Sequence, residues 1–181
     1  HNCSSLTSIT IPEGVTTIGE EAFYNCSGLT SITLPFVGNG SDKTHFGYIF
    51  GASSAYGNDY SVPDSLEEVK IKGSCSSIGQ NAFMYCRELK TIDLPESLTT
   101  IESSAFVLCE KLTIIRISEN LTTIGDRAFS SCESIEDIII PASVTYIGTD
   151  AFIGTNKLKN IYYKGSLEDW CNINFMNNNS N

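Results

Sequence analysis

Apolar residues recur along the chain in one short pattern, Leu-x-x-Ile-x-Ile, whose last positions alternate between apolar and variable. Such alternation is typical of a β-strand that turns one face to a core and the other to solvent. Pro follows four of the copies, and because Pro cannot donate to a strand ladder, we expect the strand to end there. The copies begin at Leu6, Leu29, Leu66, Leu89, Leu112, Ile135 and Leu158.

A second apolar pair follows most strands, as in Val15 and Ile18, and usually ends at Gly. This Gly, at positions 19, 79, 125 and 148, predicts either a bend with positive φ or tight packing, whereas Glu102 interrupts the series. The segment Ala-Phe-x-x-Cys comes next, and the acidic residues before it suit the start of a short helical turn.

The Ala-Phe segment sets a fixed period, because Phe83, Phe106, Phe129 and Phe152 lie 23 residues apart. Self-similarity at a period of this length is the signature of stacked-repeat proteins, whose units bury their apolar faces against their neighbours. The sequence therefore predicts a right-handed repeat solenoid, mainly β with short helical or 3-10 turns, built as a leucine-rich-repeat-like stack of parallel strands. The four Phe side chains are predicted to form one internal row.

One repeat is enlarged. Leu29 and Leu66 are 37 residues apart, 14 more than the period, and the extra length falls in residues 36–65, which are rich in Gly and aromatic residues. Insertions in solenoids lie in surface loops, often beside a binding face. Residues 46–52 still resemble a distorted Ala-Phe turn, so part of the insertion is expected to pack. Two interpretations stay open, a segment that covers core and a recognition loop.

The repeats predict a solenoid over residues 1–165 and a C-terminal cap with a polar tail over residues 166–181. Leu167, Trp170, Ile173 and Phe175 can share one helical face, which predicts a helix over 167–175 that shields the last turn. Residue 1 falls inside a repeat and is not Met, so we expect a piece of a longer protein with an open first turn.

Composition removes two classes of partner. The net charge of −10 disfavours nucleic acid and anionic membrane surfaces, because both are bound through basic patches. No run approaches the roughly 18 apolar residues of a membrane span, so we expect no membrane insertion.

Five of the seven cysteines occupy one position of the repeat and are predicted to form a column: Cys3, Cys26, Cys86, Cys109 and Cys132. Free Cys behaves as a small buried hydrophobe, so the preferred interpretation is an unbonded spine. Bridges within the column stay conceivable because neighbouring strands lie about 4.8 Å apart. A zinc site is disfavoured because no Cys-x-x-Cys pair is present.

The repeat, written out, is Ala-Phe-x-x-Cys-x-x-Leu-x-x-Ile-x-Ile-Pro-x-x-Val-x-x-Ile-Gly, and it fits nearly the whole chain. It resembles the BspA-like leucine-rich repeat family of bacterial surface proteins. The resemblance implies a secreted or cell-surface location and binding to extracellular proteins, either host matrix proteins or other cell-surface proteins. Similar insertions occur in that family, which favours the structural role for residues 36–65.

Outward strand positions supply the candidate binding residues. Lys70, Asp93 and Arg116 form an alternating-charge series on successive strands, whereas Ile114, Ile139 and Tyr162 place apolar side chains where the pattern expects polar ones. An exposed apolar patch of this kind marks a partner surface, unless a cap or a neighbouring chain covers it. We place a partner-binding surface here, with Tyr48 and Tyr56 of the insertion at its rim.

The sequence gives little support for a catalytic site. His45 is the sole internal histidine, no nucleophile-elbow motif is present, and a solvated loop histidine is the preferred interpretation. We predict no catalytic residues, no metal and no cofactor. The expected function is a non-catalytic cell-surface adhesion or protein-binding module. The alternatives are a structural spacer in a larger surface protein and, less favoured, an uncharacterised extracellular hydrolase.

Overall fold

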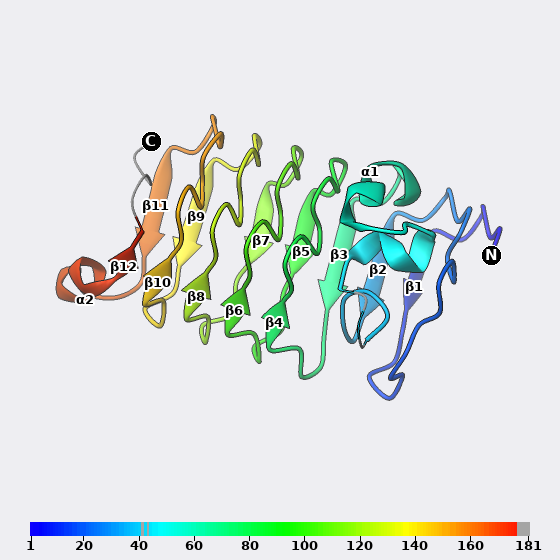
Figure 1. The fold of residues 1–181 in the computed structure, drawn as a ribbon, viewed down its shortest axis with the longest axis horizontal. Helices are drawn as coiled ribbons and strands as arrows, with labels where there is room; N and C mark the ends of the chain where they lie inside the picture. The colour runs from blue at the N-terminus through cyan, green and yellow to red at the C-terminus, as the bar shows by residue number, and fades with distance from the viewer. Residues whose placement is uncertain (41, 43, 177–181) are drawn as a thin grey trace.

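The structure is a computed structural model that describes residues 1–40, 42 and 44–176. It is a parallel-strand β-solenoid of about seven turns, drawn as a ladder of similar turns in Figure 1. The fold class predicted from the repeat is therefore confirmed. No helix in the described part of the chain is long and apolar enough to cross a membrane.

One side of the solenoid, which we call the strand wall, carries the longer strand of each turn. Its register follows the sequence repeat, so that Ile32 lies beside Val69 and Val69 beside Ile92, all pointing inward. The first five of these strands form one sheet and the last two form another. In the described residues the strands are β1 (Ser8–Thr10), β2 (Ser31–Leu34), β3 (Glu68–Ile71), β5 (Thr91–Asp93), β7 (Ile114–Arg116), β9 (Asp137–Ile140) and β11 (Asn160–Tyr163).

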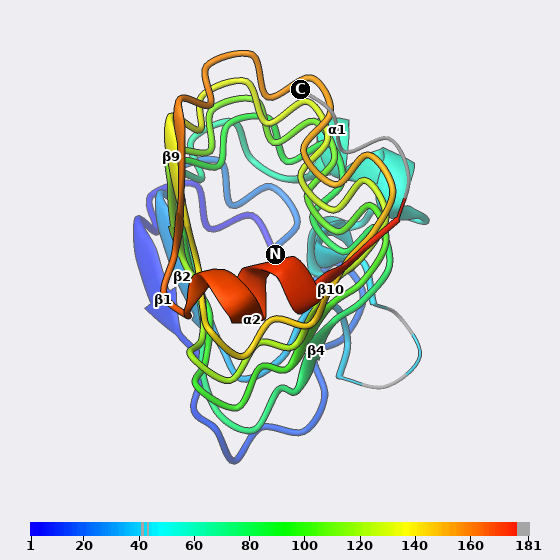
Figure 2. The same ribbon diagram turned by 90° about the vertical axis from the view of Figure 1, so that its left-hand side faces the viewer.

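A second wall of two-residue strands closes the core from the other side (Figure 2). These strands form one parallel sheet in the order β12-β10-β8-β6-β4. The strands β4, β6, β8 and β10 each place one Ile, such as Ile101 or Ile124, inside the core, whereas both residues of β12 are exposed. They are β4 (Ser77–Ile78), β6 (Thr100–Ile101), β8 (Thr123–Ile124), β10 (Tyr146–Ile147) and β12 (Asn174–Phe175).

The Ala-Phe segments form the turn face, and their aromatic rings stack along the axis of the solenoid. Ring centroids of Phe83 and Phe106, and of Phe106 and Phe129, are 5.3 Å apart, and Phe129 is 5.6 Å from Phe152. The planes of each pair lie within 4° of parallel. The predicted internal row is therefore confirmed, and it joins every regular turn to the next.

The regular turns are not helical, contrary to the expectation from their acidic residues. Each has two residues with positive φ, for example Arg127 at 53° and Ser131 at 56°. The same positions are filled by Ser104 with Leu108 and by Asp150 with Gly154. Left-handed residues interrupt helical hydrogen bonding and turn alternate N–H groups toward the neighbouring turn. Phe106 thus donates to the Ala128 carbonyl at 2.8 Å.

At Gly125 and Gly148 the repeated Gly serves tight packing, the second of the two predicted roles, whereas a Cβ on Gly19 would meet no atom within 4 Å. Positions 19, 79, 125 and 148 are not among the positive-φ residues. A Cβ on Gly125 would lie 2.6 Å from the Ser103 nitrogen and 2.7 Å from the Glu102 carbonyl carbon, which is closer than real contacts. Glu102 departs from the rule because both its carboxylate oxygens are bonded, to the Ser77 hydroxyl and the Gln80 N–H.

The enlarged repeat packs against the turn face through η1 (Phe46–Phe50), η2 (Ala55–Gly57) and α1 (Asn58–Ser61). The Phe46 ring lies 4.9 Å from Phe83, and the Phe50 ring 6.1 Å from Phe23, so the row of rings continues through the insertion. Phe46, Ile49 and Phe50 are almost fully buried. The insertion therefore covers core, which is the structural role that the sequence left open.

The C-terminal segment differs from the predicted cap. The helix α2 (Leu167–Asn172) begins at a capping box formed by Ser166 and Asp169 and ends before β12, so no single helical face runs over 167–175. Leu167 is 80% exposed, whereas Ile173 is buried. After α2 the chain reaches the second wall, where β12 pairs in parallel with β10 and so adds the last strand to that sheet. The tail predicted at 177–181 lies outside the described residues.

Candidate functional site

The register of the strand wall brings the predicted binding residues together as two series. Lys70 lies beside Asp93 and Asp93 beside Arg116, while Ile139 lies beside Tyr162. Their side chains alternate with the buried core positions and therefore face away from the core. The predicted register is therefore confirmed within β3, β5 and β7 and within β9 and β11.

The charges of this series do not form a continuous alternation. Lys70 donates to the Asp93 carboxylate and neutralises it. Arg116 is exposed, and within the described residues no ion pair joins it to Asp93 or to any other carboxylate. Arg116 therefore presents an uncompensated positive charge on a chain of net charge −10.

Three exposed apolar side chains occupy outward positions of the strand wall on β7, the strand of Arg116, and on β9 and β11. The exposed fractions are 47% for Ile114, 53% for Ile139 and 54% for Tyr162, and α2 does not cover them. We call these three residues and Arg116 the wall patch. The patch straddles the place where strand pairing is interrupted, because β7 belongs to one sheet and β9 to the next. Apolar groups beside an exposed cation are the composition typical of a protein interface.

Tyr48 and Tyr56 lie elsewhere. Tyr48 packs partly into the core with its ring against His45, at a centroid distance of 6.0 Å. Tyr56 is 65% exposed and lies beside Tyr85. The insertion that carries them projects from the turn face, on the opposite side of the cross-section from β1, β2 and β9 (Figure 2). The prediction that the insertion forms the rim of the strand-wall surface is therefore wrong.

His45 is buried, not solvated as the sequence suggested. It is 9% exposed, and its Nε2 atom lies 2.9 Å from the carbonyl oxygen of Ala52. Asp59, one of the acidic residues near it in sequence, instead accepts a hydrogen bond from Arg87 Nε at 2.7 Å. His45 thus holds the insertion in place, and no acid–base arrangement with Asp59 is formed. In the part of the chain that the structure describes, no three acidic, His or Cys side chains are grouped as metal ligands would be.

Four of the five cysteines predicted to form the column are buried as free thiols, namely Cys26, Cys86, Cys109 and Cys132. Cys109 Sγ donates to the Phe83 carbonyl and Cys132 Sγ to the Phe106 carbonyl, both at 3.1 Å. Burial raises the pKa of the Cys132 thiol to about 12 and that of Cys109 well above its ordinary value. These thiols are neutral and unreactive at physiological pH, which suits packing and not catalysis. Cys3 and Cys171 are exposed.

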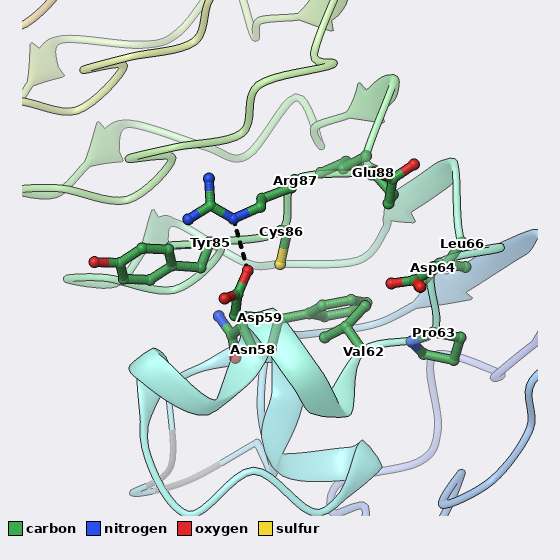
Figure 3. A pocket seen from close by; sticks show the side chains of 12 residues that line it. Asn58, Asp59, Val62, Pro63, Asp64, Leu66, Tyr85, Cys86, Arg87 and Glu88 are labelled. Carbon is green, nitrogen blue, oxygen red and sulfur yellow. Dashed lines mark hydrogen bonds and ion pairs between the residues drawn. The ribbon is translucent and has the colours of Figure 1, made fainter.

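A cleft that the sequence did not predict lies between α1 and the turn at residues 85–89 (Figure 3). It has a volume of about 70 Å³, and its lining includes Asp59, Asp64, Cys86 and Arg87. Arg87 ties the two sides together, because it pairs with Asp59 of α1 and with Glu110 of the next turn. The sequence indicates only that this repeat has 14 extra residues. Their number does not predict which turn they pack against, so the cleft could not be predicted.

The comparisons with known proteins agree with this architecture. The profile of the BspA type leucine rich repeat region matches in six copies over residues 1–48 and 58–181. The chain belongs to the BspA-type leucine-rich repeat family. The unmatched segment, 49–57, lies inside the enlarged repeat, so the family pattern resumes at the first residue of α1.

Solved structures of bacterial leucine-rich repeat proteins resemble the chain. The leucine rich repeat protein of T. pallidum is 26% identical with a TM-score of 0.52, over 85% of this chain and 57% of that one. A leucine rich cell surface protein from Faecalibacterium prausnitzii is 29% identical with a TM-score of 0.50, over 93% of this chain and 50% of that one. The chain thus spans less than two thirds of either structure. No curated protein matches the sequence significantly.

Proposed function

We propose that the chain is a non-catalytic module that binds extracellular proteins at a bacterial cell surface and contributes to adhesion. The family to which it belongs is one of repeat proteins, and one similar structure is described as a cell surface protein. Fold alone does not define a function, so the proposal depends on a specific surface.

The observation that carries the proposal is the wall patch. Ile114, Ile139 and Tyr162 are each about half exposed on a wall whose other outward positions are mostly polar. Arg116 occupies an outward position of the same wall, and no ion pair engages it within the described residues. Tyr and Arg are the residues that most often dominate binding energy when an interface buries them. A partner that covers the patch would gain apolar burial together with a charge-assisted contact to Arg116.

The test is capture of extracellular-matrix and plasma proteins, presented as a panel of purified proteins, by the immobilised chain. Arg116→Glu combined with Tyr162→Ala is expected to weaken capture of the bound protein at least tenfold. The matched control, Lys157→Glu with Tyr60→Ala, makes the same kinds of change at exposed positions away from the patch and is expected to bind normally. Both variants should unfold at the temperature of the parent chain. Equal capture by the parent and the patch variant would overturn the proposal.

A structural spacer in a larger surface protein is the second candidate. It is favoured by the spans of 57% and 50% over the similar structures, which leave room for binding repeats elsewhere. Comparison of this chain with a longer parent protein in the same panel separates the two functions. A spacer would capture nothing by itself, whereas the parent would.

A further inference from the structure

The cleft between α1 and residues 85–89 has an apolar floor. Phe46, Leu66 and Leu89 line it and are at most 3% exposed. Cys86 also lines it, and in Figure 3 its sulfur points into the space between Val62 and the turn. Burial, with a smaller contribution from the charge of Asp59, raises the pKa of this thiol, so the floor carries no charge at neutral pH.

The rim of the cleft is acidic. Arg87 is neutralised by two carboxylates, Asp59 and Glu110, and Glu88 pairs with Lys111. Asp64 is exposed, and no hydrogen bond or ion pair engages its carboxylate within the described residues. Figure 3 shows this carboxylate turned toward Cys86 and Val62, across the mouth of the cleft. Four carboxylates and two cations leave a net charge of −2 around an apolar floor.

We propose that this cleft binds a lysine side chain of a protein partner, with the ammonium group at Asp64 and the methylene stem against Val62 and Leu89. Lysine buries its apolar stem while its charged end stays near water, which matches an apolar floor below a carboxylate rim. The volume of about 70 Å³ is small, which suits the end of one narrow, unbranched side chain. The wider planar end of arginine would need a broader slot.

The enlarged repeat explains why the cleft occurs where it does. Val62, Pro63 and Asp64 belong to the extra residues, whereas residues 85–89 belong to the regular turn that follows. The helix α1, whose residues line the cleft, lies across the cross-section from β9, which carries Ile139 of the wall patch (Figure 2). Lysine binding here is therefore independent of the function proposed for the strand wall.

The test is titration of the ¹⁵N-labelled chain with acetyl-Gly-Lys-Gly-amide, followed by NMR. The expected result is saturable shifts confined to amides of residues 58–66 and 85–89, with norleucine and arginine peptides binding at least tenfold more weakly. Asp64→Asn is expected to weaken the lysine peptide about fivefold to tenfold, because it removes the carboxylate at the mouth. Val62→Phe, which fills the cleft without a change of charge, should abolish the localised shifts.

The control is Glu133→Gln, which removes one negative charge at an exposed position on another turn and should leave the affinity unchanged. Arg116→Glu with Tyr162→Ala should also leave it unchanged, which keeps this result separate from that of the wall patch. Equal binding of the norleucine or arginine peptide, an unchanged affinity in Asp64→Asn, an equal loss in Glu133→Gln, or no saturable shift with the lysine peptide would each overturn the proposal.

Discussion

The regular turns and the enlarged repeat solve the same packing problem by different means. A regular turn pairs with the next through backbone groups: Asn81, Phe83 and Tyr85 donate to the carbonyls of residues 103, 105 and 107. In the enlarged repeat, Phe46 keeps one such bond, to the Ala82 carbonyl at 2.8 Å. A second bond is supplied by a side chain, because Asn58 Nδ2 donates to the Met84 carbonyl at 2.8 Å.

Asn58 also accepts a hydrogen bond from the Gly47 N–H at 2.8 Å and is 1% exposed. One buried amide thus satisfies backbone groups on both sides of the junction, a role that the backbone fills in the regular turns. A buried backbone group without a partner is costly, so the junction depends on a single side chain. In the regular turns several backbone hydrogen bonds share this role, so no single side chain is essential to them. The stacked Phe rings are expected to contribute most to the stability of these turns.

The largest effect is expected in the regular turns. Phe106→Ala removes a fully buried ring that stacks on Phe83 and on Phe129, and it should lower the free energy of unfolding by about 4 kcal/mol. Urea denaturation measures the change. Tyr60→Ala, at a ring that is 77% exposed, should alter it by less than about 0.5 kcal/mol. A loss below about 2 kcal/mol for Phe106→Ala would show that the ring row is not the main support.

A somewhat smaller effect is expected at the junction. Asn58→Ala leaves the Gly47 N–H and the Met84 carbonyl without a partner, which should cost about 3 kcal/mol. The loss should be local, so that thiol labelling of Cys86, beside the insertion, becomes faster while that of Cys132 does not. Asn156→Ala, at an exposed asparagine, is the neutral control. Equal acceleration at both thiols would contradict the dependence of the junction on Asn58.

Two glycine substitutions test whether adjacent turns must approach each other closely. Gly125→Ala forces a Cβ to within 2.6 Å of backbone, and overpacking of this kind should cost about 2 kcal/mol. Gly19→Ala is the matched control, because a Cβ there meets no atom within 4 Å. Thermal unfolding compares the two variants. A similar loss in both would mean that the glycines serve flexibility and not packing.

The smallest change in stability is expected from the ionisation of each buried cysteine at alkaline pH. The pKa values of Cys86, Cys109 and Cys132 are raised by burial, so above the ordinary thiol pKa the folded chain holds protons that the unfolded chain releases. Stability should therefore fall as pH rises beyond about 8.5, by up to about 1.4 kcal/mol per pH unit for each thiol. Cys132→Ala should reduce the slope by one thiol's share. An unchanged slope would contradict this assignment.

The sequence predicted the features that repeat. Spacing of 23 residues placed Phe83 through Phe152 in one row and set the register of Lys70, Asp93 and Arg116. These predictions succeeded because a stacked repeat converts sequence spacing directly into proximity. Periodicity is also why the outward position of Tyr162 could be assigned before its surroundings were known.

Prediction from the sequence was wrong or incomplete where the repeat is interrupted and where a side chain has two possible ion-pair partners. Asp93 could pair with either neighbour, and the structure pairs it with Lys70 and leaves Arg116 exposed. The sequence predicts a solvated His45, because it lies in a loop outside the repeat, yet the fold buries it. Apart from Gly154, the left-handed residues of the regular turns carry no glycine signal, since hydrogen bonds between turns stabilise this conformation in other residues such as Leu108.

By itself, then, the sequence determined the stack, its row of rings and the outward face of its strands, because each follows from a repeat of fixed length. Only the tertiary structure decided where the 14 extra residues fold, that Asn58 closes the junction, and that a cleft lined by Asp64 and Cys86 opens beside it. Those features depend on contacts between segments that share no period, and their geometry is fixed only when both segments are packed.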